Sequence, residues 1–285
     1  MKTRRIFSIV VLLIIMALVG TAFTACSLFD FSDLTTTGTD EQQEVDISSN
    51  KLSDSATNKE IIIQMVEPPA GTDSSLVQVV ESVSSSVVDV IVKIKTSGRY
   101  GTTSTSSGSG VIISYDEEYS YILTCFHVIE NFSSIQIRLA NQDLYVAEYL
   151  GGVSSEDIAV VRIKKTGLTT AQIRKVETSP VKLGEDVIVI GNPLGTLGGT
   201  VTRGIIGGLA REIVVDGQNM TLLQTDASIN SGNSGGGMFD INGLLIGIVD
   251  AKMVGTDVEG LGFAIPIEKA MESAMQVFDT IFVLS

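Results

Sequence analysis

Three stretches of the sequence carry a histidine, an aspartate and a serine that could together form a nucleophilic catalyst. His127 is the only histidine of the chain and follows an apolar run, Asp157 precedes another apolar run, and Ser234 lies within the glycine turn Gly232–Gly236. A serine hydroxyl is a weak nucleophile until a base takes its proton. Imidazole serves as that base near neutral pH, and a buried carboxylate fixes its tautomer and stabilises the imidazolium that forms. The three residues therefore predict a catalytic triad.

The order of the three residues along the chain discriminates between folds. The turn around Ser234 also satisfies the G-x-S-x-G pattern of α/β-hydrolases, but those enzymes place their histidine after the serine. No histidine follows His127 here, so this alternative fails. The order His127, Asp157, Ser234 is that of the chymotrypsin-like double β-barrel. The glycines beside Ser234 allow the sharp turn with which two N–H groups can point at one developing oxyanion.

The elements that must position these residues are short and rich in Val and Ile. Turn clusters of Gly, Asn, Ser and Asp separate them, a pattern typical of an all-β sandwich or barrel rather than of a parallel α/β sheet. We expect strands at Val87–Ile94, Gly110–Ser114, Tyr121–Thr124, Ile135–Leu139, Ile158–Ile163, Val187–Ile190, Ile213–Val215, Leu222–Gln224, Leu244–Val249 and Gly262–Ile265. We expect short helices at the two ends, one over Val77–Val83 capped by Asp73 or Ser74, and one opened by Pro266. The fold class is therefore predicted as all-β, a chymotrypsin-like double β-barrel with short N-terminal and C-terminal helices.

The N-terminus has the order of charges and apolar residues that export signals show. Within residues 1–25, three basic residues precede the apolar run Ile6–Val19, and small residues follow. The stretch Phe23–Ala25 before Cys26 resembles a lipobox, so we expect Cys26 to be lipidated, as in a bacterial lipoprotein. A retained membrane helix and a plain cleaved signal followed by secretion are the alternatives. All three place the remaining chain outside the cytoplasm, at the cell envelope or beyond it.

A spacer is predicted between the export signal and the folded domain. Apolar residues are few and without period between Asp30 and Glu60, so that stretch cannot offset its ordering entropy by burial. We therefore expect residues 26–72 to be a flexible acidic linker, and residues 73–280 to form the folded domain. Thr96–Ser109 is a low-complexity Ser/Thr/Gly segment, which predicts a loop.

The chain resembles the protease domain of the HtrA/Deg family in five stretches: LTCFHVIE, DIAVVRI, VIVIGNPLG, TDASINSGNSGG and GLGFAIPI. The resemblance covers about residues 75–275 and has the motifs in the family's order. It implies two six-stranded barrels, at about residues 86–175 and 180–266, with the active site in the cleft between them. Only 18 residues follow Ile267, so we expect the domain without the PDZ domain that most members of the family carry.

The resemblance also implies a role for each site residue. Ser234 is expected to be the nucleophile, His127 the general base and then the general acid, and Asp157 the orienting carboxylate. The N–H groups of Gly232 and Ser234 are expected to form the oxyanion hole, with Asn233 held between them. These roles make the predicted protein a trypsin-like serine endopeptidase of the HtrA type.

The substrate pocket is expected around four residues. Ser228 lies near the pocket floor of the broader fold and is neutral, so it offers no counter-charge to a Lys or Arg side chain. Ile229 matches a position that lines the pocket in HtrA proteins and favours small or medium apolar side chains. We place Lys252 and Met253 on the opposite wall, together with Asp250, where the family usually has uncharged residues.

The composition excludes several other classes of protein. The net charge of −14 argues against a nucleic-acid partner, because such proteins need basic surface to displace counterions. One His and two Cys cannot build an ordinary zinc site, so we expect no metal and no cofactor. Cys125 is expected to be a small buried hydrophobe rather than a redox switch.

The predicted activity is hydrolysis of peptide bonds in unfolded or misfolded envelope proteins, through an acyl-enzyme intermediate. The expected partners are polypeptide substrates and the membrane, the latter through an N-terminal lipid or helix anchor. The resemblance also implies a homotrimer, for which Leu76–Val83 is the candidate contact. Two alternatives stay open: a catalytically quiet module for binding or chaperoning at the cell surface, and a processing protease with a single client.

Overall fold

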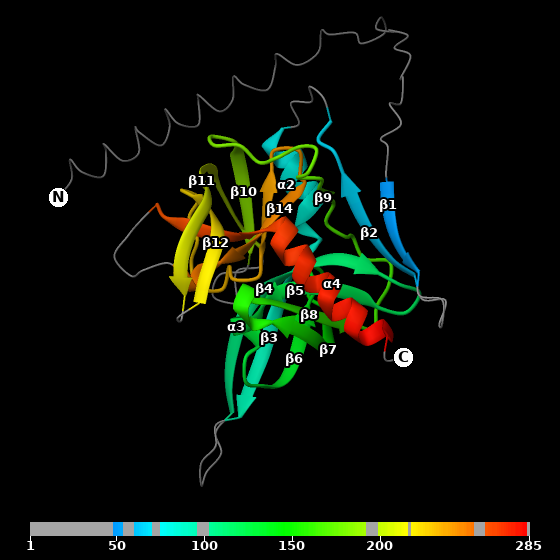
Figure 1. The fold of residues 1–285 in the computed structure, drawn as a ribbon. Coiled ribbons are helices and arrows are strands. Elements are labelled where there is room, and N and C mark those ends of the chain that lie inside the picture. The colour runs from blue at the N-terminus through cyan, green and yellow to red at the C-terminus, as the bar shows by residue number, and fades with distance from the viewer. Residues whose placement is uncertain are drawn as a thin grey trace, which may run out of the picture. The chain divides into compact units, whose positions relative to one another are not determined.

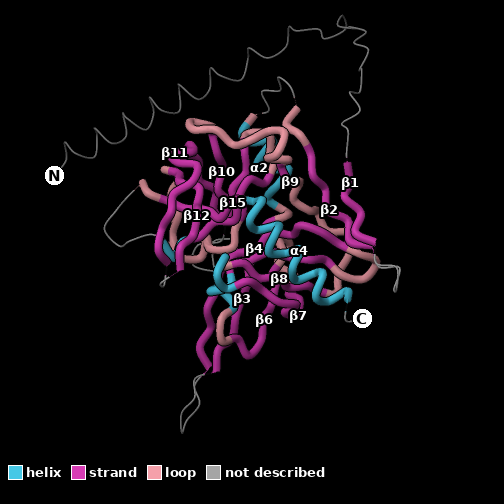
Figure 2. The backbone as a smooth tube through the Cα atoms, viewed as in Figure 1, coloured by secondary structure: helices cyan, strands magenta, loops and turns pink. Residues whose placement is uncertain are grey.

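Strands dominate the computed structural model, which describes residues 48–53, 60–69, 75–95, 103–191, 199–215, 218–253 and 260–283 (Figures 1 and 2). The predicted export signal, Cys26 and most of the predicted linker lie outside the described residues. Within the described part of the chain, no helix is long and apolar enough to cross a membrane.

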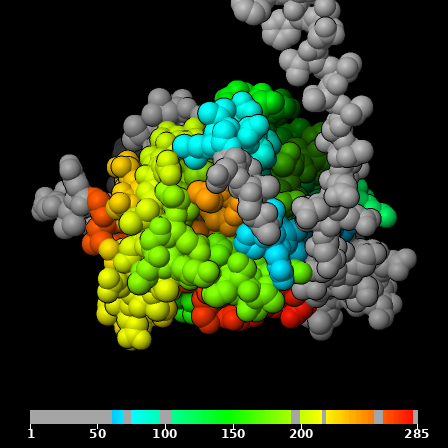
Figure 3. Space-filling view, turned by 90° about the horizontal axis from the view of Figure 1, so that it is seen from above, coloured from blue at the N-terminus to red at the C-terminus, as the bar shows by residue number. Residues whose placement is uncertain are grey.

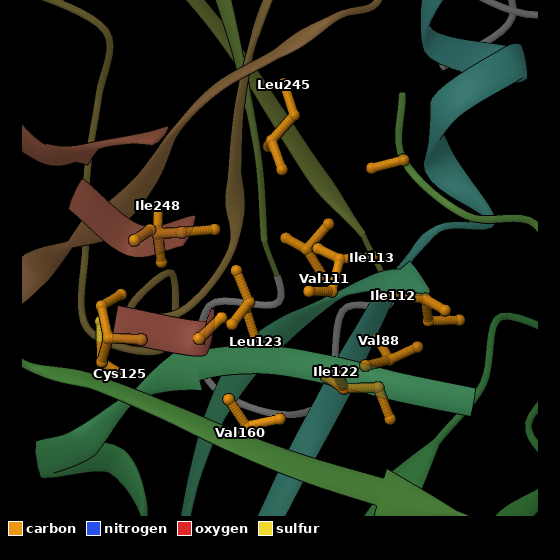
Figure 4. Packing of buried hydrophobic residues seen from close by; sticks show 14 of the residues in the cluster. Val88, Val111, Ile112, Ile113, Ile122, Leu123, Cys125, Val160, Leu245 and Ile248 are labelled. Atoms are coloured by element: carbon orange, nitrogen blue, oxygen red, sulfur yellow. The ribbon is translucent and has the colours of Figure 1, made fainter. Parts of the chain in front are cut away.

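The first barrel is a closed ring of six antiparallel strands. Pairing runs β3–β4–β5–β8–β7–β6 and returns to β3. The strands are β3 (Val87–Lys95), β4 (Thr103–Tyr115), β5 (Ser120–Cys125), β6 (Phe132–Arg138), β7 (Leu144–Val153) and β8 (Ile158–Ile163). Every residue of β5 is buried, because this strand lies between β4 and β8 with apolar side chains on both faces. Figure 4 shows this packing, with Val111, Leu123 and Val160 gathered from β4, β5 and β8.

The second barrel closes in the same way. Pairing runs β10–β11–β12–β15–β14–β13 and returns to β10. The strands are β10 (Asp186–Gly191), β11 (Thr200–Val215), β12 (Gln218–Thr225), β13 (Gly237–Asp240), β14 (Leu245–Asp250) and β15 (Gly262–Pro266). The two closed rings confirm the predicted all-β double barrel.

The structure also contains strands that the sequence analysis does not predict. In β7 the apolar residues Leu144–Ala147 are consecutive, but exposed and half-buried positions alternate, and Leu144 and Val146 are 54% and 75% exposed. In β13 only four residues pair, directly after the glycine turn of Ser234. The predicted strand at Gly110–Ser114 is longer than expected, because residues from Thr103 onward also pair with β3.

A segment assigned to the flexible linker is a strand. β2 (Glu60–Val66) pairs antiparallel with β1 (Ser48–Ser53) and β4, and parallel with the two-residue strand β9 (Ile173–Arg174), which itself pairs with β14. Ile61 and Ile63 are 2% and 3% exposed. The linker prediction is therefore wrong for β2, where isoleucines on one face of the strand enter the core.

Two helices flank the barrels. α2 (Leu76–Ser84) begins at Ser75, whose hydroxyl accepts from Gln78 N while the Gln78 side chain accepts from Ser75 N, so the cap is one residue later than predicted. It buries Val79 and Val83, leaves Val77 65% exposed, and forms part of the surface shown in cyan in Figure 3.

The C-terminal helix α4 (Ile267–Val283) starts directly after Pro266, as predicted. It contacts β14 of the second barrel as well as β7 and β8 of the first, and Figure 1 shows it in red beside both groups of strands. Its residues Ala270, Ala274 and Phe278 are buried, and the Phe278 ring meets the Tyr121 ring edge-on at 5.4 Å between centroids. This helix therefore holds the two barrels together.

Candidate active site

The first barrel supplies a histidine and an aspartate that meet at the ends of two paired strands. β5 runs directly into the short helix α3 (Phe126–Ile129), which carries His127. Because Cys125 of β5 pairs with Ile158 of β8, the residue before Ile158 lies beside α3. Asp157 accepts at its carbonyl oxygen from Phe126 N (3.0 Å), and its Oδ1 accepts from His127 N (2.9 Å).

The Asp157 side chain also orients the imidazole ring. Its Oδ2 lies 2.6 Å from His127 Nδ1, and the two side chains are 9% and 20% exposed. A carboxylate only accepts hydrogen bonds, so Nδ1 carries the proton and Nε2 is left as the acceptor. Asp157 follows the 3₁₀ turn Ser154–Glu156 with a left-handed backbone (φ 51°), which aims its carboxylate at the ring.

The second barrel supplies the serine. Ser234 Oγ lies 3.1 Å from His127 Nε2. Its turn depends on Gly235, whose φ of 84° suits glycine and where a Cβ would collide with the carbonyl oxygen of Ser109. The structure therefore brings together all three predicted triad residues, and this arrangement can move the Ser234 proton onto His127.

The predicted oxyanion donors lie in the same turn. Within the described residues, the N–H groups of Gly232 and Ser234 donate no hydrogen bond, whereas the intervening Asn233 N donates to Asn230 O (3.0 Å). Asn233 is 1% exposed and held between the two donors. Two unengaged donors beside a nucleophile can stabilise a developing oxyanion.

Ser109 is a site residue that the sequence reasoning missed. It lies on β4 of the first barrel, and its hydroxyl donates to Gly232 O (2.7 Å) while its N–H donates to Ser234 O (2.8 Å). Thr124 Oγ1 in turn donates to Ser109 O (2.8 Å). Ser109 falls at the end of a stretch of Ser, Thr and Gly, and no pattern distinguishes it there from its neighbours.

Cys125 lies behind the triad and is fully buried. Burial, and then the carboxylates of Asp157 and Asp250, raise the pKa of the Cys125 thiol well above its usual value. Its Sγ contacts Val249 O at 3.4 Å. A thiol held neutral in this way is a packing group rather than a nucleophile.

Cys125, His127 and Asp157 also form a group whose ligand atoms lie within 4.8 Å of one another, among the described residues that could hold a metal ion. However, His127 Nδ1 is already bonded to Asp157, and a neutral buried thiol is a poor ligand. A metal would have to displace the bond that orients the imidazole, so the geometry fits a triad better than a metal site.

The predicted pocket residues differ in their exposure to solvent. Ser228 is exposed, and its carbonyl oxygen accepts from Thr202 Oγ1 (2.9 Å). Ile229 is 5% exposed and packs against Gly262, where an added Cβ would lie 2.6 Å from the isoleucine side chain. Lys252 is exposed, and the side chain of Met253 lies outside the described residues.

Asp250 is fully buried, and its Oδ1 accepts from Lys252 N (2.9 Å). The assignment of a specificity pocket to the four predicted residues stays a prediction. A surface groove of about 520 Å³ lies elsewhere, between α4 and β9, and none of the four lines it.

Comparison with known proteins agrees with the serine protease that the geometry of the triad indicates. A trypsin-like peptidase domain matches residues 108–248, which include all three triad residues. The serine protease Do-like HtrB of Bacillus subtilis is 41% identical over 177 residues, covering 59% of this chain and 38% of that protein. The chain thus spans about a fifth to two fifths of the length of the curated relatives it matches.

Solved structures agree. The serine endoprotease from Yersinia pestis is 34% identical, with a TM-score of 0.58, and the match covers 72% of this chain and 67% of that one. The HtrA-type protease AlgW, solved with a decapeptide, is 28% identical with a TM-score of 0.65 over the same shares of the two chains. This chain belongs to the HtrA/Deg family of trypsin-like serine proteases.

Proposed function

We propose that the chain is a serine endopeptidase in which Ser234, His127 and Asp157 act as the catalytic triad. The observation that carries this proposal is the unbroken chain of contacts from the Asp157 carboxylate through the imidazole to Ser234 Oγ, at 2.6 and 3.1 Å. The two unengaged N–H groups beside Ser234 support it, because they offer a place for the oxyanion.

The chemistry follows from these contacts. Ser234 Oγ attacks the scissile carbonyl carbon while its proton passes to His127 Nε2, and the carbonyl oxygen becomes an oxyanion bound by Gly232 N–H and Ser234 N–H. His127 then gives the proton to the leaving amine as the C–N bond breaks, which leaves an acyl-enzyme. Water repeats the sequence with the same base and releases the acid. Asp157 keeps its charge throughout and stabilises the imidazolium.

The proposed substrates are unfolded or misfolded polypeptides outside the cytoplasm. The peptide bound to a structural relative supports a polypeptide substrate, and residues 1–25 support export, with Cys26 as the proposed site of lipidation. The trimer contact through Leu76–Val83 is likewise a proposal. Leu76 and Val77, which are 40% and 65% exposed, are the apolar side chains available for it.

A fluorophosphonate probe tests the triad directly, because it forms a covalent bond only with an activated serine. Mass spectrometry should place the adduct on Ser234 in the wild-type protein and detect none in Ser234→Ala or His127→Ala. Ser231→Ala is the matched control, since this exposed serine lies in the same turn and should leave labelling unchanged. Absence of labelling in folded wild-type protein would contradict the proposal.

One observation favours a second function, a protease fold used only for binding. Ser234 Oγ also accepts a hydrogen bond from Ala251 N (3.1 Å), which engages one of the two lone pairs of the oxygen that must attack. A quiet module would bind unfolded polypeptides equally well as wild type and as Ser234→Ala, with no cleavage by either. An endopeptidase would cleave as wild type and only bind as the variant, so assays of cleavage and binding separate the two.

A further inference from the structure

A second carboxyl group lies against the triad. Asp250 ends β14 and is 0% exposed. The residue before it, Val249, exchanges two hydrogen bonds with the catalytic turn, from Gly235 N (2.9 Å) and to Gly236 O (2.8 Å). The residue after it, Ala251, donates to Ser234 Oγ (3.1 Å). The backbone of Asp250 is therefore fixed on both sides by the turn that carries the nucleophile.

The two oxygens of the Asp250 side chain have different surroundings. Oδ1 accepts from Lys252 N (2.9 Å) at the start of the 3₁₀ turn Ala251–Met253. Oδ2 is buried and has no hydrogen-bond partner. A buried carboxyl oxygen without a donor is costly, and folded proteins contain few such groups. An uncharged residue could cap the same turn without that cost.

The titratable and charged groups that interact electrostatically with Asp250 come from four elements. They are Asp157 before β8, His127 on α3, Cys125 at the end of β5, and Lys252 on its own segment. Burial raises the pKa of Asp250, the nearby Asp157 carboxylate raises it further, and His127 lowers it. The histidine is thus the triad member whose positive charge favours an ionised Asp250.

We propose that Asp250 is a positioning residue that, as a buried anion, stabilises the imidazolium formed on His127 when Ser234 attacks. This inference rests on the proposed triad chemistry. As the general base, the imidazole gains a positive charge only when it takes the serine proton, so the Asp250 charge has little to attract before that step. In the transition state the imidazole carries a positive charge, and a second buried anion beside Asp157 interacts with it in surroundings of low dielectric. The costly buried carboxyl is therefore useful only while His127 holds the serine proton.

The predicted signature is a rate effect that depends on pH. Asp250→Asn keeps the shape of the side chain and the oxygen that caps Lys252 N, and removes only the charge. The second-order rate of fluorophosphonate labelling, measured from about pH 5 to about pH 9, should be on the order of tenfold lower in the variant at the alkaline end. Toward lower pH the two rates should converge, because protonation of the Asp250 carboxyl, whose pKa is raised, removes its charge from the wild type as well.

Asp240→Asn is the matched control. Asp240 is a buried carboxyl of the same barrel, 2% exposed, whose Oδ2 lies 3.3 Å from Arg174 Nη1 and whose Oδ1 accepts from the N–H groups of Asn242 and Leu244. Because it does not face the triad, its substitution should leave the ratio to wild type independent of pH.

The outcomes separate this inference from the proposed function. Wild-type protein that is folded yet unlabelled would overturn the triad itself, and this inference with it. Labelled wild type with an Asp250→Asn profile parallel to its own would overturn only the role of Asp250. Failure of Asp250→Asn to fold near neutral pH would also overturn it, because a group that is costly as a buried anion should be tolerated better as a neutral amide.

Discussion

The hydroxyl of Ser109 donates a 2.7 Å hydrogen bond to the carbonyl oxygen of Gly232, which lies 123 residues further along the chain. Ser109 N–H donates to the Ser234 carbonyl oxygen as well, so one residue of the first barrel holds the carbonyl groups of both residues that flank Asn233. The oxyanion donors of the second barrel therefore depend on a strand of the first. From this relationship we expect Ser109 to affect catalysis through the position of the turn rather than through contact with substrate.

Ser109→Ala should lower the rate of fluorophosphonate labelling at Ser234 by about tenfold or more. Without the hydrogen bond from the Ser109 hydroxyl, the Gly232 carbonyl is no longer held, and the neighbouring N–H groups can turn away from the position of the oxyanion. Stability should fall by about 1 kcal/mol, the contribution of an ordinary buried hydrogen bond. Ser106→Ala is the control, since Ser106 is exposed on the same strand. Equal labelling rates for the two variants would contradict the role of Ser109.

Asp157→Asn should lower the labelling rate by about 10⁴-fold while the protein stays folded. An amide can donate to Nδ1 and thereby favour the tautomer in which Nε2 carries the proton and cannot accept one from Ser234. Rates of probe attachment, with thermal unfolding as the check on folding, measure this effect. A loss smaller than about tenfold would mean that another group orients His127.

Asp250→Asn should make the protein more stable near neutral pH. Because the pKa of Asp250 is raised in the folded state, its contribution to stability is present below its unfolded pKa and is lost as the pH rises through the folded value. The asparagine variant has no such loss, so it should be more stable than the wild type at neutral pH, and the difference should shrink toward zero below the ordinary pKa of an aspartate, about 4. Urea unfolding at a series of pH values measures it, and a gain that does not depend on pH would refute the ionisation of Asp250 as its cause.

Ile63→Ala should destabilise the domain by about 2–5 kcal/mol, because Ile63 is 3% exposed in β2 and its loss leaves a cavity. Ile62→Ala, at the adjacent half-buried position, should cost clearly less. Denaturant unfolding of both variants makes the comparison. Equal and negligible losses would restore the linker assignment for this segment.

Much of the fold is visible in local patterns. The strand Ile158–Ile163 was predicted with the bounds that the structure gives it, because a continuous apolar run buried on both faces has a clear start and end. The helix after Pro266 was equally clear. β7 was missed because its exposed and half-buried positions alternate, so that part of its apolar side chains stay on the surface. β2 was missed because the linker, argued from the polar stretch that ends at Glu60, was extended over the mostly apolar run Ile61–Val66.

The residue types of the triad, their order along the chain and the glycine turn of Ser234 were determined by the sequence alone, because each rests on local chemistry. Only the tertiary structure decided that Ser109 is hydrogen-bonded to Gly232 and that Asp250 is buried between two residues that are bonded to the turn of Ser234. The first relationship joins two residues that are 123 positions apart in the sequence. The second depends on which side of the end of β14 faces the interior. Such contacts arise when the two barrels close and pack together, and no local pattern encodes that packing.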